Sequence, residues 1–207
     1  MAASFWPEPM LALRDRLLGS RRFRRWAAAF PATRGITRRR SRELFDLCAG
    51  FVYTSVLLAC VRVRLFACLR AGPRTQAQLC AETELPAEAL NRLLAAAASL
   101  RLVQETRDGR WRLGDRGAVL DGLPGVQAMI EHHALLYQDL TDPVALLRAG
   151  RGRHLGTYWG YAADAPAERL EEAQVSPYSQ LMATSQPLVA DEILAVHRLA
   201  PYRRILD

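Results

Sequence analysis

Apolar and polar positions alternate with a helical period along most of the chain. Between Met10 and Phe30, leucine and aromatic side chains interleave with arginines, which predicts a basic amphipathic helix. The segment from Leu44 to Leu69 is instead apolar on nearly every face, which predicts a helix that is buried all round. Because one layer of short helices covers only part of such a helix, we expect a second copy of the chain to cover the rest in a homodimer.

Two short helices and a hairpin are expected next. Residues 75–78 have the Thr-x-x-Gln spacing of a capping box, so a short helix begins there. Pro86 suits a first helical position, and leucines spaced three and four apart predict a helix that ends near Leu100. Residues 102–106 and 111–113 have the pattern of two strands around an Asp-Gly turn. This order of a long helix, two short helices and a hairpin is that of a winged helix.

The remainder of the chain is again helical, with one change near its end. Helices are expected over residues 126–147, 167–174 and 177–199, with an aromatic loop at 154–161. Residues 203–207 switch to a short apolar run that ends in Asp, as at the entry of a β-strand. The pattern as a whole therefore predicts a mainly α protein.

All 28 basic side chains are arginine, and their placement is uneven. Residues 1–42 hold eleven arginines against only Glu8 and Asp15, so the excess positive charge belongs to this arm. Such an arm lies in an anionic membrane interface or packs, solvated, on the rest of the protein, and the sequence leaves both readings open. The apolar run 47–61 is shorter than the ~20 residues of a spanning helix, and no secretion signal is found. We expect a cytoplasmic protein, peripheral at the inner membrane if the arm binds lipid.

A winged helix is often a DNA-binding module, and this alternative makes a different prediction. The candidate recognition helix, residues 86–100, offers only Arg92 against Glu88 and is otherwise largely Ala and Leu. It lacks the positive footprint that phosphate contacts need, and acidic residues alternate with the arginines of the hairpin region. We therefore expect no nucleic-acid partner. A winged-helix regulator and a non-catalytic interaction module remain the alternative functions.

The histidines and cysteines argue against a metal site or a disulfide framework. His132 and His133 are adjacent and so face different sides of a helix, while His154 and His197 stand alone. The four cysteines lie in apolar helical sequence with no Cys-x-x-Cys pair. We expect neither a metal nor a disulfide, which fits a reducing compartment.

Three strings of the sequence resemble a known enzyme family. They are Arg25-Trp-Ala-Ala-Ala-Phe-Pro31, Arg42-Glu-Leu-Phe-Asp-Leu47 and Tyr178-Ser-Gln-Leu-Met-Ala-Thr-Ser-Gln-Pro187. Together with the predicted element order, they resemble the caffeate- and hydroxyindole-type O-methyltransferases, and among these the bacterial carotenoid branch that acts on hydroxyneurosporene or demethylspheroidene. One departure is Arg101, which stands where relatives often have glycine; a left-handed backbone there would cost a non-glycine residue ~1 kcal/mol.

The resemblance implies a winged-helix dimerisation domain followed by a Rossmann-like α/β domain that binds S-adenosylmethionine. It divides the chain into an Arg-rich amphipathic arm (1–42), a winged-helix dimerisation domain (43–122), a helical linker and substrate lid (123–200), and the start of a truncated cofactor domain (201–207). Ile205-Leu-Asp207 would immediately precede the glycine-rich cofactor loop. We therefore expect that loop, the ribose-binding acid and the general base to lie beyond this chain, and this portion alone to be inactive.

The resemblance also points to substrate-binding residues, but to no catalytic or cofactor-binding residue in this chain. Tyr178 and Met182 are four apart, hence on one helical face, and match an aromatic-x-x-x-Met pattern that faces the substrate in this family. Met129, Tyr158 and Trp159 fall where relatives contribute pocket walls. A thioether and aromatic rings make an adaptable apolar wall, which suits a lipophilic polyene. From spacing alone, an ordinary core pair explains Tyr178 and Met182 equally well.

Overall fold

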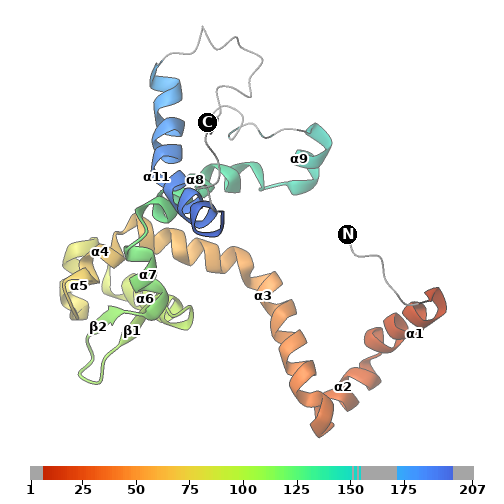
Figure 1. Ribbon diagram of the computed structural model, residues 1–207. Helices are drawn as coiled ribbons and strands as arrows, with labels where there is room; N and C mark the ends of the chain where they lie inside the picture. The colour runs from red at the N-terminus through yellow and green to blue at the C-terminus, as the bar shows by residue number, and fades with distance from the viewer. Residues whose placement is uncertain (1–6, 151, 153, 155–171, 198–207) are drawn as a thin grey trace. The chain divides into compact units, whose positions relative to one another are not determined.

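The computed structural model describes residues 7–150, 152, 154 and 172–197. Over this part the chain is mainly helical with one two-stranded antiparallel sheet (Figure 1), which confirms the predicted mainly α class. The chain divides into two compact units, residues 1–53 and 54–207. The aromatic loop expected at 154–161 and the strand entry expected at 203–207 lie almost wholly outside the described residues.

The first unit begins with two short helices instead of the single helix predicted over residues 10–30. Helix α1 spans Glu8–Gly19 and α2 spans Arg21–Ala29. Ser20 between them has an extended backbone, and its hydroxyl accepts a hydrogen bond from the Phe23 amide at 3.4 Å. Ser20 is therefore the N-cap of α2, and this cap begins a new helix where the apolar period alone indicates continuity.

Specific side chains hold both corners of this unit. The Arg24 guanidinium donates at 3.1 and 3.2 Å to two carbonyl oxygens at the end of α1, which that helix leaves unpaired. At the second corner α3 (Pro31–Arg62) begins, and the hydroxyls of Thr33 and Thr37 donate to the Ala27 carbonyl oxygen of α2 at 2.8 and 3.3 Å. The relative directions of α1, α2 and the start of α3 are thus fixed by hydrogen bonds.

Helix α3 begins earlier and ends earlier than the helix predicted over residues 44–69. The backbone turns through Arg64, whose φ of 56° is left-handed, and α4 then spans Leu65–Arg70. The buried residues of α3 are Cys60 and Val61, close to its end. Within the single chain, the predicted burial on every side is therefore wrong for residues 44–55, none of which is buried, and holds only for single residues close to the end of α3.

Short helices build the core of the second unit. Helices α5 (Gln76–Thr83) and α6 (Ala87–Ser99) follow α4, where the sequence predicted two short helices. The buried residues of α4 and α6 recur three or four positions apart, so one side of each helix packs inward. The largest fully buried side chains include Leu65, Phe66, Leu69, Leu79, Leu90, Leu94 and Val103.

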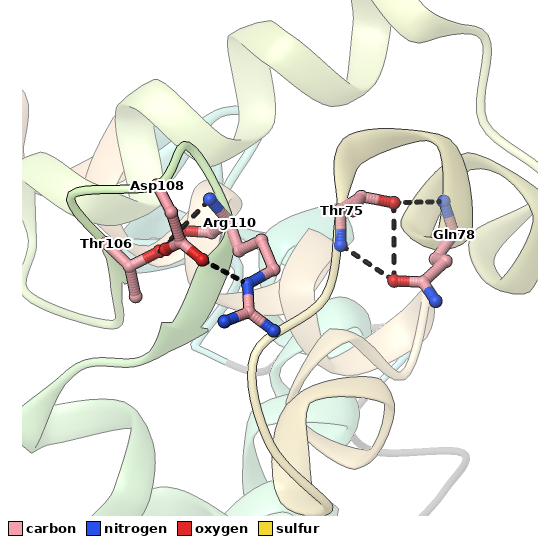
Figure 2. A network of polar contacts seen from close by, with 5 residues as sticks. All are labelled: Thr75, Gln78, Thr106, Asp108 and Arg110. Carbon is pink, nitrogen blue, oxygen red and sulfur yellow. Dashed lines mark hydrogen bonds and ion pairs between the residues drawn. The ribbon is translucent and has the colours of Figure 1, made fainter.

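The predicted capping box is present at the start of α5 (Figure 2). The Thr75 amide donates to Gln78 Oε1 at 2.9 Å, and the Gln78 amide donates to Thr75 Oγ1 at 3.3 Å. Each side chain thereby satisfies a backbone donor that the first turn of the helix leaves unpaired. The hydroxyl and the amide at this spacing fix where α5 begins.

The predicted hairpin follows α6. Strands β1 (Val103–Glu105) and β2 (Trp111–Leu113) pair antiparallel, and Arg74 forms a further bridge to the outer side of β2 through two backbone hydrogen bonds of 2.8 Å with Trp111. The segment before α5 is thereby attached to the hairpin.

The turn of the hairpin is closed by its own polar side chains (Figure 2). Gly109 takes the left-handed conformation, φ 73°, that the Asp-Gly pair predicted. The Thr106 hydroxyl accepts from the Arg110 amide at 3.0 Å, and the Arg110 guanidinium donates to Asp108 at 2.6 Å. Hydrogen bonds from Thr106 and then Arg110 hold the pKa of Asp108 below its usual range.

Three helices follow the hairpin, and the last two lie where the sequence predicted a single helix over residues 126–147. Helix α7 spans Asp115–Asp121, α8 spans Pro124–Asp139 and α9 spans Pro143–Ala149. Asp142 separates the last two, since its carboxylate accepts from the first two amides that follow Pro143, at 3.1 and 2.9 Å. An aspartate N-cap followed by a proline at N1 is a strong signal for a new helix.

Helix α11 spans Glu172–Val196. The sequence predicted two helices here, over residues 167–174 and 177–199, but the described residues form one continuous helix across the expected break at 175–176. Pro187 stands inside it, so one hydrogen bond of the helix is missing there. The helix packs on α8 (Figure 1), and Ile130 of α8 and Leu181 of α11 are both buried. Along the chain, these two helices come after the helices and the hairpin that supply the buried leucines of the second unit.

Candidate dimerisation surface and substrate-side helices

The middle of α3 carries a broad apolar face that the single chain leaves exposed. Its members recur at helical spacing on one side: Leu44, Leu47, Cys48, Phe51 and Val52. Leu47 is 80% exposed and Phe51 is 73% exposed. A contiguous exposed apolar surface of this kind marks an interaction site. We call these five residues the α3 face.

The opposite side of the same segment is polar. The Tyr53 hydroxyl donates a hydrogen bond to Asp46 Oδ1 at 3.0 Å, two helical turns away. This bond to a carboxylate raises the pKa of Tyr53, so its hydroxyl stays a protonated donor at neutral pH. The segment is therefore two-sided, and its apolar side is the one suited to docking.

The sequence pattern indicated that the apolar run 47–61 is too short to cross a membrane, but α3 as a whole is long and apolar enough to do so. It is the one helix among the described residues with that property. A helix that a second protein subunit covers passes the same test. Near its end, Cys60 and Val61 belong to the leucine-rich core of the second unit. The length and composition of α3 show that its apolar face is suited to burial. They do not distinguish a lipid bilayer from a second protein subunit as the partner.

Helices α8 and α11 form the second candidate site, and their backbones approach closely. A Cβ atom on Gly125, in the first turn of α8, would lie 2.3 Å from the Thr184 carbonyl oxygen of α11. No side chain fits there, so the glycine permits the close packing of the two helices. The sequence pattern assigned Gly125 no role, because this glycine lies directly before the helix predicted over residues 126–147.

The structure places two of the expected substrate residues on these packed helices. Met129 lies one turn after Gly125, on the side of α8 that approaches α11, and is half-buried. Met182 follows the buried Leu181 on α11 and is also half-buried, with the Gln186 side-chain amide 3.7 Å from its sulfur. Both thioethers thus belong to the same helix pair.

The other expected substrate residues are described only in part or not at all. The backbone of Tyr178 lies on α11 one turn before Met182, as their spacing predicted, but its side chain is outside the described part of the structure. Tyr158 and Trp159 lie outside the described residues altogether. The grouping of these aromatic rings with the two methionines therefore stays a prediction.

Titratable groups near this helix pair do not assemble a reactive centre in the described part of the chain. Burial, and then the neighbouring His133, lower the pKa of the half-buried His132 on α8, so its imidazole is neutral at neutral pH. Burial raises the pKa of Cys60 to about 12, which keeps its thiol protonated. Over the described residues, no three His, Cys, Asp or Glu side chains gather as metal ligands would.

Three arginines of α6 and the hairpin region are paired with carboxylates. The pairs are Arg92 with Glu88, Arg101 with Asp115, and Arg110 with Asp108. Each pair neutralises positive charge that a DNA-reading surface would direct at phosphates. On the candidate recognition helix α6, Arg92 is thus paired with a carboxylate of the same helix.

Comparison with known proteins finds similarity to O-methyltransferases. Residues 45–120 match the O-methyltransferase dimerisation domain. The chain is 42% identical over 192 residues to a demethylspheroidene O-methyltransferase of Cereibacter sphaeroides, across 93% of this chain and 50% of that protein. It is 40% identical over 177 residues to one of Rhodobacter capsulatus, across 86% and 44%. The chain thus spans about half the length of the curated relatives it matches.

Solved structures share the architecture at lower sequence identity. Human N-acetylserotonin methyltransferase, solved in complex with S-adenosylmethionine, aligns with a TM-score of 0.58 and 23% identity over 77% of this chain and 49% of that chain. This likeness concerns the fold.

Proposed function

We propose that this chain is the dimerising, substrate-side portion of an S-adenosylmethionine-dependent O-methyltransferase that acts on a carotenoid hydroxyl. Two findings support the proposal: the match to the O-methyltransferase dimerisation domain, and the similarity to about half of each of two demethylspheroidene O-methyltransferases. The observation that carries the proposal is 42% identity extending over 93% of the chain. The expected cytoplasmic location belongs to the same proposal.

Dimerisation takes place through the α3 face. Its residues begin at the edge of the matched dimerisation domain, and their exposed apolar surface is of the kind that a partner subunit buries. The homodimer expected from the sequence is consistent with this surface, because a second copy supplies an identical apolar face. The helices α5 and α6 with the hairpin form the winged helix of this domain, used for assembly and not for reading DNA.

The substrate-side wall is formed by α8 and α11. Met129 and Met182 are half-buried on these helices, and we assign Tyr178, Tyr158 and Trp159 to the same wall from the resemblance. Apolar, polarizable side chains suit a polyene chain, and they exclude water from it. Their contribution to catalysis is positioning: they hold the substrate so that its hydroxyl meets the donor methyl group in line.

The described residues do not fit the donor site. Such a site needs a glycine-rich loop after a strand of a parallel sheet, and the only sheet among the described residues is the antiparallel hairpin. We therefore assign no described residue to S-adenosylmethionine, to its ribose or to the general base. When bound, the cofactor would supply an electrophilic methyl group.

The decisive test of this function is methyl transfer by the complete gene product. We expect the gene to continue past the codon for Asp207 into a glycine-rich loop, and the full product to transfer labelled methyl from S-adenosylmethionine to demethylspheroidene. A complete product that forms no methyl ether with this substrate would overturn the carotenoid assignment. A stop codon after Asp207 would favour a non-catalytic module.

The substrate wall has its own test in the same assay. Met182→Ala in the complete product removes part of the apolar wall, so we expect kcat/KM for the carotenoid to fall about tenfold, mainly through a higher KM. Leu147→Ala on the exposed face of α9 is the control, because Leu147 is 82% exposed, and it should leave both constants unchanged. If the two substitutions changed kcat and KM equally, Met182 would not be part of the substrate-binding wall.

The dimer interface is tested by placing a charge in it. Leu47→Asp should convert the dimer to a monomer, because an unpaired carboxylate would be buried against the partner. Leu147→Asp is a matched control, since Leu147 is as exposed as Leu47 and lies outside the α3 face. Light scattering after size-exclusion chromatography gives the mass of each variant. A Leu47→Asp protein that stays dimeric would place the interface elsewhere.

A further inference from the structure

The first unit holds a concentration of positive charge that neither dimerisation nor substrate binding uses. From Arg16 to Arg42 the sequence has ten arginines and no Asp or Glu. These arginines are exposed, and they lie on α1, α2 and the first part of α3. We call residues 8–42 the arginine arm.

The arginine arm is an ordered structure with defined corners. Arg24 caps the end of α1, and Thr33 and Thr37 tie the start of α3 to the Ala27 carbonyl oxygen of α2. Because these contacts are made within the arm, the remaining arginines keep a fixed arrangement. A flexible linker would not need these hydrogen bonds at its helix ends.

Large apolar side chains are exposed beside this charge. On α1, Met10, Leu13 and Leu17 are exposed at spacings of three and four, so they form one stripe. On α2, Trp26 is 54% exposed and stacks on Phe30 at 5.2 Å between ring centroids and 11° between planes. The arm therefore presents aliphatic and aromatic surface together with guanidinium groups.

We propose that the arginine arm is an interfacial anchor that binds the anionic surface of a lipid bilayer. Guanidinium groups pair with lipid phosphates, and Trp26 suits the boundary between headgroups and acyl chains. The exposed aliphatic stripe on α1 would be removed from water in that boundary, which is favourable. A nucleic-acid backbone has no apolar surface that could cover the stripe. A second copy of the arm is excluded as the occupant, since it would bring the same excess of arginine against the first.

This anchor would place the protein where a lipophilic substrate is dissolved, which is a consequence that rests on the proposed function. The anchor itself does not, because binding to a bilayer needs neither methyl donor nor substrate. The two proposals can therefore fail independently.

Vesicle co-sedimentation of the 207-residue chain tests the anchor. We expect binding to phosphatidylcholine vesicles that contain 30% phosphatidylglycerol, little binding to pure phosphatidylcholine, and release as salt is raised from 0.05 to 0.5 M. The triple variant Arg21→Gln, Arg22→Gln and Arg25→Gln should bind roughly a hundredfold more weakly, because each charge near the surface contributes about fivefold. These three arginines make none of the corner contacts, so the arm keeps its fold.

Two further variants make the result specific. Arg107→Gln, Arg112→Gln and Arg148→Gln together remove the same charge from exposed positions outside the arm and should bind as the unchanged chain does. Trp26→Ala should weaken binding while leaving the arginines in place, and circular dichroism checks that each variant is folded.

Four outcomes would overturn the proposal. The first is no binding to anionic vesicles, and the second is equal loss of binding in the two arginine triples. The third is binding to a 20-base-pair DNA duplex at 0.15 M salt that is tighter than binding to the vesicles, which would make the arm a nucleic-acid surface. Membrane binding that survives 1 M salt in the arm triple would transfer the role to α3.

Discussion

At the scale of single residues, Gly125 allows α8 and α11 to meet. A Cβ atom there would come within 2.3 Å of a backbone carbonyl oxygen, whereas one on Gly122 would find its nearest neighbour at 3.5 Å, an ordinary contact. We expect Gly125→Ala to lower the free energy of unfolding by about 1–3 kcal/mol through overpacking, and Gly122→Ala to change it little. Urea denaturation followed by circular dichroism measures both. Equal stability of the two variants would contradict the close approach of the helices.

Asp121 makes the stability of the second unit depend on pH. Its carboxylate accepts two hydrogen bonds of 2.8 Å from the Arg70 guanidinium, which hold the pKa of Asp121 below its usual range. Its contribution to stability is therefore present above the unfolded pKa of about 3.9 and is lost as pH falls through the lower folded pKa. We expect Asp121→Asn to be less stable than the unchanged chain at neutral pH.

That difference should narrow below pH ~4, where the unchanged chain also loses the charge. Thermal unfolding at a series of pH values measures it. Asp191→Asn, at an exposed position of α11, is the control and should be as stable as the unchanged chain at neutral pH. A constant gap between Asp121→Asn and the unchanged chain from pH 7 to pH 3 would mean that the ion pair is not its cause.

Residue roles differ in how far the sequence could predict them. Thr75 and Gln78 are three apart, so their capping box was predictable from local spacing. Arg101 has a left-handed backbone, φ 62°, at the position where the resemblance led us to expect that conformation. Arg70 and Asp121 are 51 positions apart, and nothing local connects them. Local hydrogen bonds leave a sequence signal, and distant pairs do not.

At the scale of elements, the capping box governs the start of α5. Thr75→Ala removes the side-chain oxygen that satisfies the Gln78 amide, so we expect a loss of about 1 kcal/mol in unfolding free energy. Thr75→Ser keeps the oxygen and should retain most of the stability. Chemical denaturation of the three proteins distinguishes the results, and equal losses in both variants would show that the methyl group and not the cap matters.

Helix boundaries were predicted less well than helix identity. The pattern of apolar positions predicted single helices over 10–30 and 126–147, and the structure divides each one. In both cases the break lies at a capping residue, Ser20 or Asp142, whose side chain accepts from the amides that follow. An apolar stripe can continue across such a corner, so periodicity does not register it.

At the scale of the whole molecule, the exposed α3 face links folding to assembly. If a dimer buries this face, the folded state is stabilised by mass action and the melting temperature rises with concentration. For two chains of this length we expect about 1–2 °C for each tenfold increase. Differential scanning calorimetry over a hundredfold range measures it, and Leu47→Asp should remove the dependence. A melting temperature independent of concentration in the unchanged chain would argue for a folded monomer.

The sequence by itself determined the mainly helical class, the two short helices, the capping box and the hairpin, because each depends on residues a few positions apart. It also carried the strings that led to the methyltransferase family. Only the tertiary structure decided that the apolar middle of α3 lies exposed, that Gly125 lets α8 meet α11, and that Arg70 reaches Asp121. The reason is physical: periodicity shows which side of a helix is apolar, while burial depends on which distant segment, or which second chain, packs against it.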